Sequence, residues 1–185
     1  KAVGKPLAKL AVQVMLGKSL HDLGIHEDLD LNLTTFNVKA PVFPFHKFPG
    51  VDILLGPEMK STGEVMGRGK TFAAAYSKAM TAAGMNLPTS GNVFLSICDE
   101  DKAAALPIAK NLYLLGFKLW ATEGTCKLLR DYGLRAERIN KVLEGSPHCV
   151  EAMTEGKFAL VINTTSSITA VKDSFSLRRT ALERK

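Results

Sequence analysis

The stretch WATEGTCKLLRDYG, residues 120–133, joins the end of an apolar run to the start of an amphipathic helix. Thr122 and Thr125 flank Gly124 at this junction. Threonines at such a point are most often turn or helix-cap residues. The alternative is that their hydroxyl groups, together with the first N–H groups of the helix, face an anion. Both interpretations predict a strand that ends near Thr122 and a helix that follows it at once.

The same alternation of strand and helix continues on both sides of this stretch. It predicts strands over residues 92–97, 117–122, 134–141 and 158–164, and helices over residues 99–116, 124–133, 148–157 and 169–185. Pro107 must either lie in the first turn of its helix or kink it. Short connections between alternating strands and helices predict an α/β fold, a parallel sheet with helices on both faces. In such folds, ligands bind outside the carboxyl ends of the strands.

The residues before Pro88 have a different pattern, mostly helical. Apolar residues at helical spacing predict a helix over residues 5–17, and an alanine-rich segment predicts a second one over residues 70–84. Two prolines interrupt residues 33–48, which are therefore predicted to form an extended edge segment. Residues 48–69 are rich in glycine and proline and are predicted to form an ordered loop. The linker around Pro88 marks a domain boundary.

Composition restricts the classes of function. Lys and Arg number 24 against 18 Asp and Glu in 185 residues, and the formal net charge of +6 favours an anionic partner. The basic residues are scattered, apart from Arg178 and Arg179, and only 7% of the residues are aromatic, so no nucleic-acid surface is predicted. The three cysteines include no C-x-x-C pair, which is typical of a reducing cytoplasm. No apolar run is long enough to predict a membrane span.

Polar side chains gather where the four predicted strands end. Those able to donate a hydrogen bond to an anion are Ser96, Lys102, Thr122, Thr125, Asn140, Lys141, Asn163, Thr164, Thr165 and Ser166. The N-terminus of a helix adds unpaired N–H groups and a partial positive charge, and Gly124 lets the backbone approach the anion. Taken singly, each residue also fits a cap or a turn. Together they predict a phosphate-binding site without a pair of carboxylates.

No catalytic or metal-binding constellation accompanies this site. His21 and His26 lack the H-E-x-x-H spacing of zinc enzymes. The GKS and GKT tripeptides at residues 17–19 and 69–71 lack the earlier glycine of a P-loop. We therefore predict neither catalytic residues nor a metal site within this chain.

Several longer stretches resemble one known family, the large chain of carbamoyl phosphate synthetase. PVFPFHKFPGVDILLGPEMKSTGEVMG (residues 41–67) closely resembles the segment just past its second ATP-grasp active site, and PLAKLAVQVMLGKSL (residues 6–20) resembles the segment before that one. FKLWATEGTCKLL (117–129), INKVLEGSPH (139–148) and LVINTTSS (160–167) resemble its allosteric domain, which has the methylglyoxal synthase-like fold. The similarity runs in register across the chain.

This resemblance implies two domains and a parent enzyme. Residues 1–87 would be the C-terminal tail of the carbamoyl-phosphate-forming ATP-grasp half, and residues 88–185 a regulatory domain truncated at its C-terminus. The parent would be an ATP-dependent ligase that makes carbamoyl phosphate from bicarbonate, ATP and glutamine-derived ammonia, for pyrimidine and arginine synthesis. Its ATP and Mg²⁺ or Mn²⁺ would bind upstream, so the chain alone should hold no cofactor and be inactive.

The resemblance also implies partners. In the family, the regulatory domain binds a nucleotide, typically UMP as inhibitor or IMP as activator. The positions that match its phosphate ligands are Lys102, Thr122, Thr125, Lys141, Asn163 and Thr165, and Asp173 matches a position that reaches the ribose. The other implied partners are the rest of the large chain and the glutaminase small subunit, in a cytoplasmic oligomer, with no membrane or nucleic acid.

Three departures leave the effector open. Ser167, Ile168 and Thr169 stand where many members carry a glycine and basic residues, and Ala40 stands where some carry an acidic residue for an ornithine activator. The chain also ends before the final strand of the family. The alternative is a stand-alone methylglyoxal synthase-like enzyme that acts on a small phosphorylated substrate. That enzyme needs an aspartate base in the loop after the third strand, and residues 144–156 contain none.

Overall fold

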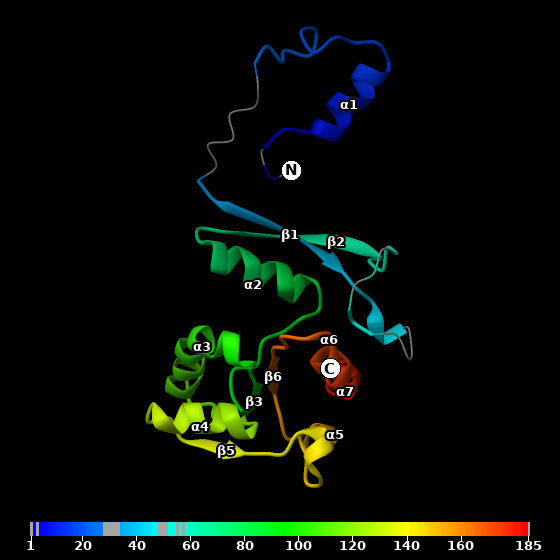
Figure 1. Ribbon diagram of the computed structural model, residues 1–185. Coiled ribbons are helices and arrows are strands. Elements are labelled where there is room, and N and C mark those ends of the chain that lie inside the picture. Colours follow the sequence, from blue (N-terminus) through cyan, green and yellow to red (C-terminus); the bar gives the residue numbers. More distant parts are fainter. Residues whose placement is uncertain are drawn as a thin grey trace. The chain divides into compact units, whose positions relative to one another are not determined.

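The computed structural model describes residues 2, 4–27, 34–47, 52–54, 56 and 58–184. The chain divides into two compact units (Figure 1). The first unit comprises Lys1–Val42 and Thr62–Met85, and the second comprises Phe43–Ser61 and Asn86–Lys185. Residues 43–61, although they lie between two segments of the first unit in sequence, therefore belong to the second. The assignment of residues 1–87 and 88–185 to two domains of a synthetase stays a prediction.

In the part of the chain that the structure describes, the first unit has two helices and a two-stranded antiparallel sheet. Its elements are α1 (Leu7–Met15), β1 (Phe36–Val42), β2 (Gly63–Gly69) and α2 (Phe72–Ala82). The helices lie where the sequence predicts them, and the predicted extended segment contains β1. Helix α2 begins after Thr71, whose hydroxyl accepts a hydrogen bond from the N–H of Ala74. Helix α1 has no buried residue.

The predicted loop over residues 48–69 is wrong for Gly63–Gly69, which form β2. The strand contains three glycines and lacks the alternation of apolar and polar residues by which a strand is recognised. Its glycines are explained by the helix that covers it. A Cβ on Gly67 would collide with the carbonyl oxygen of Ala75, and a Cβ on Gly69 would lie 2.7 Å from the nitrogen of Ala75. The backbones of β2 and α2 are therefore in direct contact.

The second unit contains a parallel sheet that, among the described residues, has four strands. They are β3 (Asn92–Ser96), β4 (Lys118–Ala121), β5 (Ala136–Arg138) and β6 (Leu160–Asn163). Their order across the sheet is β5-β4-β3-β6, and every neighbouring pair is parallel. The α/β fold class predicted from the alternation of strands and helices is confirmed.

Helices connect and follow these strands. They are α3 (Lys102–Leu114), α4 (Glu123–Asp131), α5 (Cys149–Thr154), α6 (Ile168–Asp173) and α7 (Phe175–Glu183). Short 3₁₀ turns, η2 (Asp99–Asp101) and η3 (Val142–Glu144), precede α3 and α5, and η1 (Phe45–Lys47) lies in the segment over residues 43–61. Pro107 lies inside α3, past its first turn, so the first of its two predicted alternatives is wrong.

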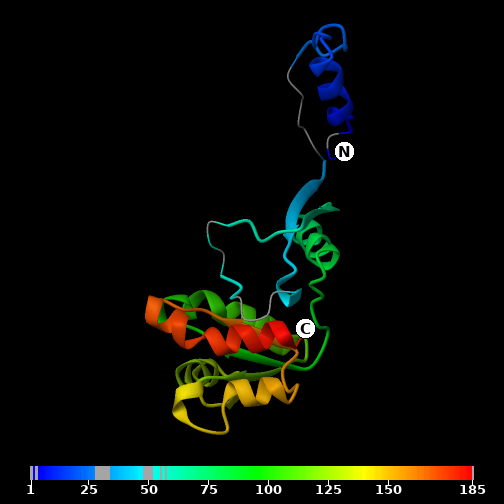
Figure 2. The same ribbon diagram turned by 90° about the vertical axis from the view of Figure 1, so that its right-hand side faces the viewer.

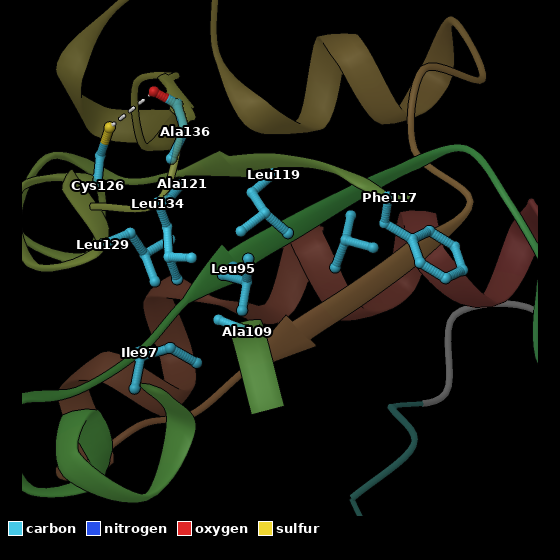
Figure 3. Packing of buried hydrophobic residues seen from close by; sticks show 11 residues of the cluster. Leu95, Ile97, Ala109, Phe117, Leu119, Ala121, Cys126, Leu129, Leu134 and Ala136 are labelled. Carbon is cyan, nitrogen blue, oxygen red and sulfur yellow. Dashed lines mark hydrogen bonds between the residues drawn. The ribbon is translucent and has the colours of Figure 1, made fainter. Parts of the chain in front are cut away.

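Helices cover both faces of the sheet, as predicted. Along β3, Val93 and Leu95 point to one face and Phe94 to the other. The first face packs against α3 and α4, and Figure 3 shows Leu95 and its neighbours among residues such as Leu129. The second face packs against α5 and α7, where Leu177 joins Phe94. Figure 1 shows these two pairs of helices on opposite sides of the strands.

The single final helix predicted over residues 169–185 is wrong, because α6 and α7 meet at Ser174 (orange to red in Figure 2). The hydroxyl of Ser174 donates to the carbonyl oxygen of Val171, 3.0 Å away, which competes with continuation of the helix. Arg178 reinforces the junction, since its Nη1 donates to the same carbonyl and to the hydroxyl of Ser174. Its Nε and Nη2 donate to the two carboxylate oxygens of Asp52, at 3.0 and 2.6 Å.

Strand β5 lies at one edge of the sheet. The N–H of Ile139 donates to Ala121 of β4, so alternation along the strand turns the carbonyl of Ala136 toward the outer edge. Nε and Nη2 of Arg130, in α4, both donate to that carbonyl oxygen, at 2.9 and 2.7 Å. The thiol of Cys126 also points to it, and burial raises the pKa of this thiol.

Candidate functional site

The two threonines of the junction at residues 120–133 lie at the end of β4, against the end of β3. Thr122 is the residue before α4 and Thr125 lies in its first turn, and both are almost fully buried. The hydroxyl oxygen of Thr125 accepts a hydrogen bond from the N–H of Ile97 at 3.2 Å. The hydroxyl of Thr122 does not cap the helix and lies 3.5 Å from that of Thr125. The threonines therefore join two strand ends.

Lys102 lies over the N-terminal turn of α4. A Cβ built on Gly124 would be 3.3 Å from the Nζ of Lys102, so the glycine gives the ammonium group its room. This Nζ also forms an ion pair of 2.6 Å with Asp99 in the turn before α3. The lysine side chain is one-quarter exposed, whereas that of Asp99 is 92% exposed. A cation therefore stands at the positive end of a helix, with a solvent-exposed carboxylate as its partner.

Lys141 follows the end of β5 and precedes the turn η3. The hydrogen bond and charge of Lys102 hold the pKa of Asp99 below its ordinary value, and the charge of Lys141 lowers it further. The backbone N–H of Lys141 donates to Glu144, 2.9 Å away, while its side chain is exposed. Of the two lysines predicted to bind phosphate, Lys102 therefore forms an ion pair with Asp99, and Lys141 acts on that carboxylate through its charge.

The end of β6 supplies the remaining predicted residues. Asn163 lies opposite Ser96 of β3 and is half-buried, as is Thr165. Between them, the hydroxyl of Thr164 accepts from the N–H of Cys98 at 3.0 Å and lies 3.3 Å from the sulfur. Asn163 and Thr165 therefore lie beside the strand end that leads to Lys102.

Asp173 is not joined to the others. It is the last residue of α6 and is exposed, and within the described ranges its carboxylate makes no hydrogen bond or ion pair. Two cavities of about 600 and 400 Å³ lie elsewhere in the second unit, and none of the seven residues matched to the family's ligands lines them.

Sequence reasoning missed Asp99. The signal was a carboxylate three residues before Lys102, on the same side of a helical turn. Glu100 and Asp101 adjoin it, and the local sequence does not distinguish the three acids. His148 caps α5, because its Nδ1 accepts from the N–H of Glu151, whose carboxylate accepts from the N–H of His148.

Other classes of site leave no trace in the described residues. Among them, no group of three or more His, Cys, Asp or Glu is placed to hold a metal ion. None of the helices that the structure describes is long and apolar enough to cross a membrane. The chemistry that the strand ends do offer is hydrogen bonding and charge for an anion.

Comparison with known families agrees with this geometry. Residues 104–185, which run from α3 to the end of the chain, match the model of the MGS-like domain. The second unit contains an MGS-like domain. The match includes the junction at residues 120–133, Lys141 and the end of β6, and Lys102 lies two residues before it.

The chain as a whole is similar to carbamoyl phosphate synthase large chains. It is 47% identical over 185 residues to that of Pseudomonas putida, 50% over 188 residues to that of Mesorhizobium japonicum, and 50% over 186 residues to that of Pasteurella multocida. Each match covers all of this chain but only 16% to 17% of the relative, in its C-terminal part. The resemblance stated from the sequence is confirmed, with the MGS-like domain at its C-terminal end.

Proposed function

We propose that the MGS-like domain binds a phosphorylated nucleotide effector, UMP or IMP, and thereby regulates a carbamoyl phosphate synthetase of which this chain is the C-terminal part. The phosphate would lie at the N-terminus of α4, held by Lys102, Thr122, Thr125 and Lys141. Asn163 and Thr165 would complete the phosphate site. Asp173 would bind the ribose.

The observation that carries this proposal is the position of Lys102, whose ammonium group lies beside Gly124 in the first turn of α4 and pairs with Asp99. Like charges repel, so a cation lies at a positive helix terminus only where an anion offsets it. Asp99 supplies one negative charge, and a phosphate monoester supplies about 1.5 to 2 at pH 7 with three acceptor oxygens. A phosphate therefore satisfies both lysines and the helix N–H groups better than Asp99 does.

Thr125 would need only a small adjustment to bind the phosphate. Its hydroxyl oxygen accepts from the N–H of Ile97, while its own proton points to the carbonyl of Ile97 over a long 3.4 Å. That proton can turn to a phosphate oxygen without breaking the shorter bond. Its contribution should be the ordinary one of a neutral donor, about 0.5–1.5 kcal/mol.

The parent enzyme belongs to the same proposal. It would be a glutamine-hydrolysing ligase of pyrimidine and arginine synthesis, located in the cytoplasm, with the glutaminase small subunit and further large-chain segments as partners in an oligomer. Its ATP and Mg²⁺ or Mn²⁺ would be held by residues that precede this chain. The 185 residues alone should therefore neither hydrolyse ATP nor form carbamoyl phosphate, which a turnover assay of the purified chain measures.

Calorimetric titration of the chain with UMP, IMP and inorganic phosphate tests the effector site. We expect a nucleotide to bind and inorganic phosphate to compete with it. Lys102→Ala and Lys141→Ala should each weaken binding about tenfold or more, because each removes a charge-assisted donor. Thr125→Ala should weaken it less, and added salt should reduce the share of the lysines.

Lys127→Ala is the matched control. Lys127 lies on α4 as well, is exposed, and forms an ion pair with Asp131 in the last turn of the helix. Its removal changes the net charge equally and should leave the affinity unchanged. If both strand-end lysine variants bind nucleotide like the parent chain, the proposed site is wrong. Turnover of a small phosphorylated substrate would instead favour the stand-alone enzyme.

A further inference from the structure

Arg178 uses its whole guanidinium group to hold two separate parts of the second unit. Nε and Nη2 grip the two oxygens of Asp52, and Nη1 donates to the carbonyl of Val171 at 2.8 Å and to the hydroxyl of Ser174 at 2.6 Å. The side chain of Arg178 is only 12% exposed and that of Asp52 is 25% exposed. A bidentate pair with this little exposure is geometrically specific, unlike an ordinary surface ion pair.

At one end, this arrangement fixes the backbone around Asp173. Val171 and Ser174, which Arg178 binds, lie on either side of Asp173 at the end of α6. The carboxylate of Asp173 itself is exposed, and no described residue bonds to it. Arg178 therefore binds residues on both sides of Asp173 without touching its carboxylate.

At the other end, the arrangement holds Asp52, which lies within residues 43–61. Asp52 is 126 positions from Arg178, and its Oδ1 also accepts from the N–H of Leu54 at 3.4 Å. These residues connect β1 to β2, the two strands of the first unit, although they belong to the second unit themselves. One guanidinium group thus links the end of α6 to the connection between those strands.

We propose that Arg178 is a positioning residue for the nucleoside end of the effector, acting through Asp173, and that its ion pair with Asp52 couples effector binding to residues 43–61. The inference rests on the proposed function. A ligand held by Asp173 gains from the conformation that the ion pair stabilises, and by linkage the ligand stabilises the ion pair equally. Inorganic phosphate would contact the lysines but not Asp173, so its affinity would not depend on the ion pair.

Affinities of two ligands separate this role from a general structural one. Arg178→Met and Asp52→Asn should each weaken binding of the tighter nucleotide, UMP or IMP, about five- to tenfold. Both should leave the affinity for inorganic phosphate unchanged. Asp173→Asn should show the same pattern, since it removes the contact directly. The Arg178→Met, Asp52→Asn double variant should lose no more than either single variant, because the two residues act as one pair.

Arg184→Met is the matched control, with the same change of charge at the C-terminal end of α7, where Arg184 is exposed. It should bind both ligands like the parent. Hydrogen exchange gives a second readout: the nucleotide should slow exchange of the Leu54 amide in the parent chain, and inorganic phosphate should not.

The outcomes are distinguishable. If the parent chain binds neither nucleotide nor phosphate, the proposed function fails and this inference fails with it. If the parent binds nucleotide and Asp52→Asn binds it equally well, the inference is overturned while the proposed function stands. If Arg178→Met and Asp52→Asn lose nucleotide and phosphate together, the ion pair is structural only, and the inference is again overturned.

Discussion

Helix α2 of the first unit packs on its sheet through alanine against glycine, whereas helices of the second unit bury leucine and methionine against large side chains of their sheet, such as Phe94. Ala75 and Ala79 are fully buried on β2, where Gly67 and Gly69 leave no room for a Cβ. In the second unit, Phe94 and Leu129 are buried to the same degree within two extended clusters. One core of this chain is therefore packed by direct contact between backbones, and the other by large side chains that fill the space between elements.

Because the two cores are packed differently, the stability of the two units should be sensitive to opposite kinds of substitution. Where backbones touch, adding a single methyl group creates a clash that a rigid helix and strand cannot relieve. Where large side chains fill the space, removing atoms leaves a cavity and loses apolar burial. Added atoms should therefore damage the first unit, and removed atoms the second.

The largest effect is expected from Phe94→Ala in the second unit. The ring is fully buried and stacks on that of Phe158 with centroids 5.4 Å apart, so its loss should cost about 3–5 kcal/mol of unfolding free energy. Denaturant unfolding followed by hydrogen exchange measures it, with the loss confined to the second unit. Phe72→Ala is the control, since Phe72 is 58% exposed in the first unit and its truncation should matter little. If Phe94→Ala and Phe72→Ala lost the same unfolding free energy, the proposed difference between the two units would be contradicted.

Gly67→Ala tests the first unit in the opposite direction. The added methyl group would collide with the backbone of α2, and we expect a cost of about 3 kcal/mol with exchange of α2 amides accelerated. Gly63→Ala in the same strand is the control, because nothing lies within 4 Å of its Cβ position. Protected α2 amides in the Gly67→Ala variant would show that this packing tolerates an added atom.

Acid should lower the stability of the second unit through protonation of Asp52. The hydrogen bonds and charge of Arg178 hold the pKa of Asp52 below its ordinary value. A carboxyl group with a depressed folded-state pKa stabilises the fold above its unfolded pKa, and this stabilisation is lost as pH falls through the folded value. We expect a loss of about 1.5 kcal/mol below about pH 4. In Asp52→Asn, this part of the acid dependence should disappear from unfolding curves recorded between pH 7 and pH 3.

The smallest effect is expected from Gly124→Ala. The Cβ would lie 3.3 Å from the Nζ of Lys102, which is the end of a flexible side chain and can move. Stability should be unchanged or slightly raised, because alanine favours a helix over glycine. Affinity for inorganic phosphate should fall about twofold as the ammonium group shifts. A thermal melt and a titration of the same sample measure the stability and the affinity for inorganic phosphate. An unchanged affinity would contradict the position proposed for the ammonium group of Lys102 in the site.

The sheet of the second unit could be predicted because its strands and helices differ in period and alternate regularly. Strand β2 could not be predicted, since Gly67 and Gly69 carry no apolar side chain. The need for glycine at these positions comes only from the contact with α2, which covers them. The break at Ser174 was equally hidden. It depends on an arginine that binds Asp52, and no local pattern reports a contact between residues 126 positions apart.

The candidate site shows the same division. The position of Lys102 at the start of α4 could be anticipated because carboxyl ends of parallel strands meet at one edge of the sheet, whereas the part of Lys141 in the site stays a prediction. The part played by Asp99 could not be predicted, because three consecutive acids precede Lys102 and only the geometry of the turn selects one. The burial of Thr125 was hidden too, since its hydroxyl accepts from the N–H of Ile97, the residue that follows β3.

The guanidinium group of Arg130 has a consequence for self-assembly. An unpaired carbonyl at the rim of a sheet is a template on which a strand from another molecule can align, and so a starting point for aggregation. At β5 the outward carbonyl of Ala136 is already occupied by two N–H groups of Arg130. An incoming strand would have to displace a bound cation before it could pair there. Helix α4 thus shields its own sheet from extension at that rim.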